Sequence, residues 1–152
     1  MDLIHAVMWT IHVGFATLWT GSVLFVTLAV LPPATRGEIG SDVLGTLVGR
    51  LRWITRTAAV AFVVSGGHMA GQLYTVDTLT GTGRGHLVLT MIVLWLLVTG
   101  LVEAAGGKLS RGLDAGKLRE PARDVKPLFY VAAALSVALV ITAGLLANPF
   151  GF

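Results

Sequence analysis

The residues of this 152-residue chain with the most chemical capability are its four histidines and one nearby methionine. His5 and His12 are two helical turns apart, about 10 Å on one helix face, and Met8 lies between them at spacings of three and four. His68 and His86 follow in later apolar segments. Neutral imidazole binds copper and haem iron, and thioether favours Cu(I). These residues indicate a metal or haem site.

The composition indicates an integral membrane protein. The chain is 55% hydrophobic and 12% charged, with a mean hydropathy of +0.81, whereas soluble domains are about 25% charged. Cysteine is absent, which excludes disulfides, thiolate metal sites and iron–sulfur clusters. The net charge of +3 is explained by membrane topology, so no nucleic-acid partner is expected.

Four apolar runs are long enough to cross a bilayer, which needs about 20 residues each. We expect the first run to end at Pro32 and Pro33, and the third at Gly106 and Gly107. Pro127 is suited to the first turn of the last helix. The prediction is an all-α fold, a single membrane domain forming a four-helix up-and-down bundle. Its spans are residues 3–31, 53–74, 87–105 and 128–147.

The basic residues predict the orientation of these spans. Nine of the eleven fall between spans one and two or between spans three and four, and Arg56 lies in the first turn of span two, so ten share one side; Arg84 alone lies in the other connection. The positive-inside rule therefore predicts a multi-pass protein of the cytoplasmic membrane with both termini outside. We expect residues 106–127 to form a polar, solvated loop whose basic residues can contact anionic lipid headgroups of the bilayer.

Two histidines are predicted to lie deep in the membrane at similar levels. An intramembrane ionisable group is costly, so His12 and His68 are functional candidates. They could provide the axial ligands of a b-type haem, with Phe15 and Trp19 walling the macrocycle. The shallower histidines could equally be ordinary interfacial residues. Glu103 could reach the cytoplasmic surface or, less simply, relay protons.

Copper is the alternative occupant of the same region. Its predicted ligands are His12 and His68 with His5, His86 and Met8. Methionine in an apolar helix is more often a core residue, and the same applies to Met69 and Met91. The residues alone do not decide whether the bound cofactor is copper or haem b.

The segment from His12 to Gly21, which continues to LAVLPPA, resembles the opening of the copper-resistance D (CopD) family. The resemblance lies in a first-helix histidine, Trp19 seven residues later and an apolar run ending in proline. It implies four helices and copper uptake or tolerance. The related HemJ group of protoporphyrinogen oxidases has a similar layout but carries a lysine in the third span. Here HLVLTMIVLW contains no lysine and Thr90 is near that place, which argues against the HemJ activity.

The first functional hypothesis is copper handling through an outer-half histidine site. The second is a haem b redox protein that moves electrons between a quinol and an outer acceptor. The third is a non-catalytic accessory subunit of a larger membrane complex. The expected partners are the lipid bilayer, an extracytoplasmic metal or electron carrier, and further copies of the chain in a homo-oligomer. No complete catalytic motif is present, so enzyme activity is left open.

Overall fold

The structure, a computed structural model, describes residues 3–147 and contains only helices in that range. The predicted all-α fold class is therefore confirmed, while the termini, residues 1–2 and 148–152, lie outside the described part of the chain. The elements are α1 (Leu3–Phe25), the π-helix η1 (Val26–Val30), α2 (Leu31–Arg36), α3 (Ser41–Leu73), α4 (Val76–Gly81), α5 (Gly83–Asp114) and α6 (Arg119–Ala147).

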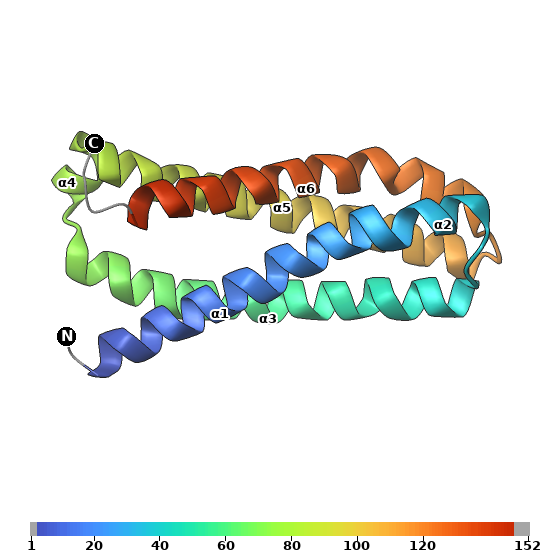
Figure 1. The fold of residues 1–152 in the computed structure, drawn as a ribbon, viewed down its shortest axis with the longest axis horizontal. Helices are drawn as coiled ribbons and strands as arrows, with labels where there is room; N and C mark the ends of the chain where they lie inside the picture. The colour runs from blue at the N-terminus through green and yellow to red at the C-terminus, as the bar shows by residue number, and fades with distance from the viewer. Residues whose placement is uncertain (1–2, 148–152) are drawn as a thin grey trace.

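The long helices lie lengthwise beside one another, and α1 crosses the length of α3 diagonally (Figure 1). α5 packs most extensively on α6, and α1 packs most extensively on α3. Contacts of α3 with α5 and of α1 with α6 join these two pairs. We call the end that carries α2 and the turn between α5 and α6 the basic end. The opposite end, which carries α4 and His86, is the histidine end (Figure 1).

The hydrophobic core fills the basic end and stops about halfway along the assembly. Its members nearest the histidine end are Trp19 on α1, Ala58 on α3, Val98 on α5 and Leu139 on α6. All four histidines lie beyond this boundary, toward the histidine end. The helices are therefore fixed tightly below the candidate site and packed less completely around it.

The first helical run does not end at the prolines, so that prediction is wrong. The π-helix η1 leads directly into α2, and the N–H of Leu31 bonds to the carbonyl of Val26, five residues back. Pro32 and Pro33 then occupy the first turn of α2, where a missing N–H costs little. The run ends instead at Gly37, whose φ of 77° is the left-handed conformation in which glycine caps helices.

The predicted polar loop over residues 106–127 is also wrong, because nearly all of it is helical. α5 continues through Gly106 and Gly107, and only residues 115–118 connect it to α6. A Cβ on Gly112 would lie 2.2 Å from Cγ of Pro121 on α6. This glycine therefore permits close helix packing where the sequence pattern indicated a flexible loop.

Pro127 lies inside α6, because that helix begins at Arg119 rather than near residue 127. Proline within a helix removes one backbone hydrogen bond. Pro127 itself is exposed at the surface of α6. At this end of the assembly an ion pair joins α5 to α6: the charged atoms of Lys108 and Asp124 are 3.2 Å apart. Lys117 in the connection pairs with Glu120 in the first turn of α6, and their charged atoms are 3.0 Å apart.

Three helices are long and apolar enough to cross a membrane: residues 3–36, α5 and α6. This result supports a multi-pass membrane protein. Within the described chain α3 is long enough but is not among them. Its apolar stretch includes small and polar residues, among them Ser65, His68 and Gln72. Such residues lower the mean hydropathy of a helix that packs against other helices.

Candidate functional site

The side chain of His12 is oriented by Ser65. Nδ1 of His12 and Oγ of Ser65 are 2.9 Å apart. The single hydroxyl hydrogen of Ser65 is donated to the carbonyl of Ala61 on its own helix, so the serine oxygen accepts from Nδ1–H of the imidazole. Nε2 of His12 is then the nitrogen with a free lone pair. A histidine whose other nitrogen is held in this way is suited to bind a metal.

Gly66 allows the imidazole to lie against α3. A Cβ at this position would be 3.2 Å from Cε1 and 3.6 Å from Nδ1 of His12. Since the first of these distances is tighter than most side-chain contacts, a larger residue would displace the ring or α1. Gly66 thus determines how closely His12 approaches Ser65.

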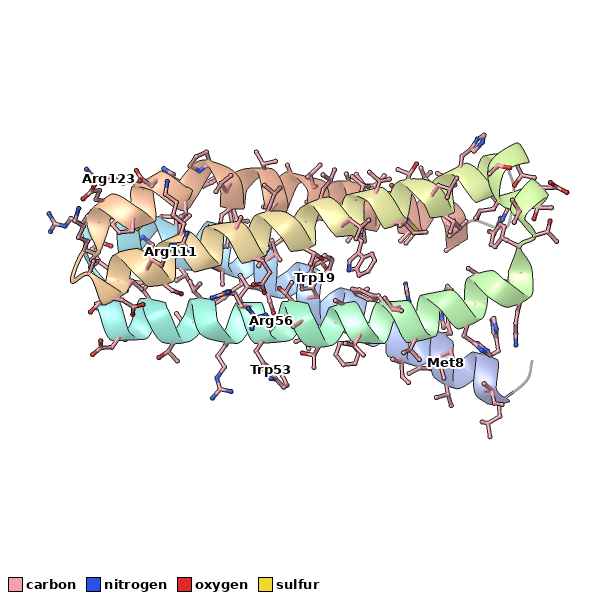
Figure 2. All side chains as sticks on the ribbon, turned by 180° about the vertical axis from the view of Figure 1, so that it is seen from behind. Met8, Trp19, Trp53, Arg56, Arg111 and Arg123 are labelled. Carbon is pink, nitrogen blue, oxygen red and sulfur yellow. The ribbon has the colours of Figure 1, made fainter. Side chains whose placement is uncertain are left out.

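An aromatic cluster separates His12 from the core. The ring of Phe62 lies 5.1 Å from that of His12, 5.7 Å from Trp19 and 6.4 Å from Trp95, measured between centroids. Trp19 is 1% exposed and lies about midway along the assembly (Figure 2). Phe15 is only partly buried and packs against the core. Trp19, which was predicted to contact the macrocycle, is therefore separated from His12 by Phe62. Of these three aromatic rings, Phe62 is the one that contacts His12.

His68 contributes a buried nitrogen with no partner. Its Nε2 atom is buried and forms no hydrogen bond within residues 3–147. His68 follows Ser65 by three residues, so the two lie on neighbouring faces of α3 about 4.5 Å apart along its axis. A buried, unpaired polar atom is unfavourable. A bound ligand would remove that cost.

The other predicted ligands lie nearer the histidine end. His5 is partly exposed on α1, and Met8 lies on the same helix near its N-terminal end (Figure 2). His86 is exposed, and its Nε2 lies 2.7 Å from the carbonyl of Thr80, to which it donates. This bond ties α5 to α4 and leaves Nδ1 as the ring nitrogen with a lone pair. His86 is thus placed as a structural link between two helices.

Two further polar groups are buried on α5, beside the aromatic cluster of Phe62. Nε1 of Trp95 and Oγ1 of Thr99 have no hydrogen-bond partner within the described residues. They are four residues apart and so lie on one face of the helix. The sequence interpretation did not identify them, although their spacing and the four-residue step to Glu103 form a recognisable polar stripe.

Glu103 is bound by two arginines of α3. It accepts hydrogen bonds from Arg52 at 3.0 and 3.1 Å and from Arg56 at 2.9 Å. A Cβ on Gly106 would be 2.6 Å from Cδ of Arg52, so this glycine makes room for the arginine. This ion-pair cluster joins α3 to α5 in the half of the assembly that carries the basic end.

Within residues 3–147 no group of three or more histidine, aspartate or glutamate side chains is arranged to hold a metal ion. The candidate metal donors are therefore the imidazoles of His12 and His68, with methionine sulfur as a further soft donor type on α1. Comparison with models of known families, with characterised proteins and with solved structures finds no match to this chain.

Proposed function

We propose that the protein is a multi-pass protein of the cytoplasmic membrane in which α3 is a fourth span. The basic end faces the cytoplasm, and both termini and the α4 region face outward. The proposal is supported by the three apolar helices and by the distribution of basic residues. It is further supported by the packing of α3 against α1 and α5, because a helix enclosed by other helices can carry polar residues.

The orientation is tested with single cysteines, which the natural chain lacks. Thr78→Cys in α4 and Asp114→Cys at the end of α5 both place a thiol at an exposed position. An impermeant maleimide added to intact cells should label position 78 and should label position 114 only after lysis. Labelling of position 114 alone in intact cells would reverse the topology.

We propose that the histidine end binds copper as cargo through His12 and His68, exchanging it with an extracytoplasmic carrier. One observation carries this proposal: Ser65 directs the lone pair of His12 to Nε2, while the buried Nε2 of His68, one helical turn along, lacks a partner. Two imidazoles with Met8 as a thioether on α1 form a donor set suited to copper. His5 and Met8 lie farther out on α1 and form the access route.

A haem b redox centre is the second candidate, and a different observation favours it. The rings of Phe62, Trp19 and Trp95 surround the inner side of His12. Aromatic and aliphatic surfaces of this kind suit a macrocycle, and the same two histidines would be its axial ligands. Bound haem would supply one-electron chemistry, while the protein would fix the ligand orientation through Ser65.

The optical spectrum and copper content of the purified protein distinguish these candidates. Copper handling predicts a sample without a Soret band that binds copper stoichiometrically, whereas haem predicts Soret and α bands on reduction. His12→Ala and His68→Ala should each lose the bound species, and His86→Ala should retain it because that ring is exposed and links α5 to α4. Retention in both deep variants, or loss confined to His86→Ala, would refute the proposed ligand pair.

A further inference from the structure

A groove follows one face of α1, and the core residues Val26 and Leu51 form part of its wall. Its wider part has a volume of about 410 Å³ and lies between α1 with η1 and the first half of α3. A second depression of about 220 Å³ continues along α1 toward the histidine end. Leu18 lines both parts. The groove therefore extends from Val26 to Thr10.

The polar side chains of the groove are satisfied by their own helix. The hydroxyls of Thr10, Thr17 and Ser22 each donate to the carbonyl four residues back, at 2.7 to 2.9 Å. They require no hydrogen bond from an occupant. The rest of the wall consists of aliphatic, aromatic and glycine residues, apart from one arginine. The groove is therefore suited to an apolar chain.

Two glycines widen the groove without serving helix packing. Gly14 and Gly21 are seven residues apart and line successive parts of it. A Cβ at either position would meet no atom within 4 Å. Glycine in a helix costs roughly 0.5–1 kcal/mol relative to alanine. Close packing explains Gly66 and Gly106, but it does not explain these two.

Arg50 supplies the one charge of the wall. Its side chain is exposed, and it forms no ion pair or hydrogen bond within residues 3–147, unlike Arg52 and Arg56 two and six positions later. Phe25 and Trp53 near it are 58% and 63% exposed, and Trp53 points away from the other helices (Figure 2). Exposed aromatic residues beside arginine are typical of a membrane interface.

We propose that this groove binds an anionic phospholipid of the cytoplasmic leaflet. Arg50 binds the headgroup phosphate, and one acyl chain lies along α1 over Gly21 and Gly14. From Ser22, which lines the wider part of the groove together with Arg50, to Thr10 the helix rises about 18 Å, close to the roughly 15 Å thickness of one leaflet's hydrocarbon layer. The inference rests on the proposed membrane topology and is independent of the histidine site.

Native mass spectrometry of the full chain in detergent tests this site with two added lipids, phosphatidylglycerol and phosphatidylcholine of identical acyl chains. The wild type should retain a single phosphatidylglycerol in preference to phosphatidylcholine. The double variant Gly14→Leu/Gly21→Leu should bind both lipids about tenfold more weakly, because the leucines occupy the volume of the acyl chain. Gly100→Leu is the matched control, since that glycine is also open to space but lies on α5 outside the groove.

Arg50→Gln addresses the headgroup separately and changes only an exposed side chain. It should weaken phosphatidylglycerol binding severalfold and phosphatidylcholine binding less, because the choline ammonium of phosphatidylcholine offsets the charge of its phosphate, so the preference for phosphatidylglycerol should fall. Circular dichroism and melting temperature establish that each variant is folded. The proposal is overturned if no lipid is retained, if the glycine double variant binds as the wild type does, or if Gly100→Leu is equally impaired. Dissociation of a dimer in the glycine variant, without lipid loss, would assign the groove to a second copy of the chain.

Copper content, measured on the same preparations, separates the two proposals. Normal copper with no retained lipid would refute the groove alone, and retained lipid with no copper or haem would refute the histidine site alone.

Discussion

Trp19 donates a hydrogen bond from Nε1 to Oγ1 of Thr55 across 3.0 Å, joining α1 to α3 where the hydrophobic core begins. Thr55 in turn donates to the carbonyl of Leu51 at 2.9 Å. Both residues are 1% exposed, so water cannot replace either bond. This pair lies on the core side of the aromatic cluster and of His12 and His68.

Thr55→Val should therefore destabilise the protein by about 1–3 kcal/mol, because it leaves the buried indole N–H without an acceptor. Denaturant unfolding in a mild detergent measures the change. Thr57→Val is the control, since that hydroxyl bonds only to backbone carbonyls of its own helix. Equal effects of the two substitutions would show that the bond between the helices is unimportant.

Ser65→Ala should weaken ligand binding without removing a ligand. His12 would lose the acceptor for Nδ1–H, and loss of such an outer partner typically lowers metal affinity about 10–100-fold. Titration with copper, or haem content if the protein proves to be a cytochrome, measures the effect. Ser136→Ala is the control because Ser136 is also buried and bonds to its own helix. An unchanged affinity in Ser65→Ala would contradict the role assigned to this serine.

Met8→Leu separates the copper and haem hypotheses. If Met8 lies on the copper access route, Cu(I) loading should slow more than Cu(II) loading, because thioether prefers the softer ion. If the site holds haem, cofactor content should be nearly unchanged, because leucine conserves the volume. Stopped-flow loading kinetics and haem assays on this variant, with Met91→Leu as control, give the answer. No change in either measurement would identify Met8 as a packing residue.

Glu103→Gln should destabilise the protein by about 1–2 kcal/mol, between the values for exposed and buried ion pairs. The side chain of Glu103 is 28% exposed and that of Arg52 is 26% exposed, so solvent screens the pair only partly. Glu38→Gln breaks the exposed pair with Arg36 and should have a smaller effect in the same unfolding experiment. The reverse order would mean that the Glu103 cluster does not hold α3 to α5.

The sequence allowed the helices to be predicted but not their ends. Hydropathy identifies residues that lipid or a core can accept, so it located the apolar centre of each helix. It could not detect the polar extensions, since Gly112 and Pro121 look like loop residues until they are packed on each other. The prolines after Leu31 were misleading for a related reason: the π-helix before them relaxes the hydrogen-bond pattern that proline would otherwise break.

The candidate site was predicted in part. His12 and His68 were identified as candidates because an ionisable side chain is costly to place deep in a bilayer. Their role as ligands is still a prediction. Phe62 was missed because a phenylalanine in an apolar helix carries no chemical signal. Its spacing from Thr55 and Ser65, seven and three residues, was available and marks the buried face of α3. Distances across helices were the missing information, since periodicity gives a face but not its neighbour.

The π-helix at Val26–Val30 has a consequence for sequence length. One turn of π-helix holds about one residue more than a turn of α-helix. It therefore resets the rotational phase of α2, and the buried residues Leu31 and Ala34 of that helix depend on this phase. Deleting one residue here would rotate them by about 100° relative to the core. Insertions and deletions are consequently expected to be far better tolerated in the turn at residues 37–40 than within this segment, although the two are close in the sequence.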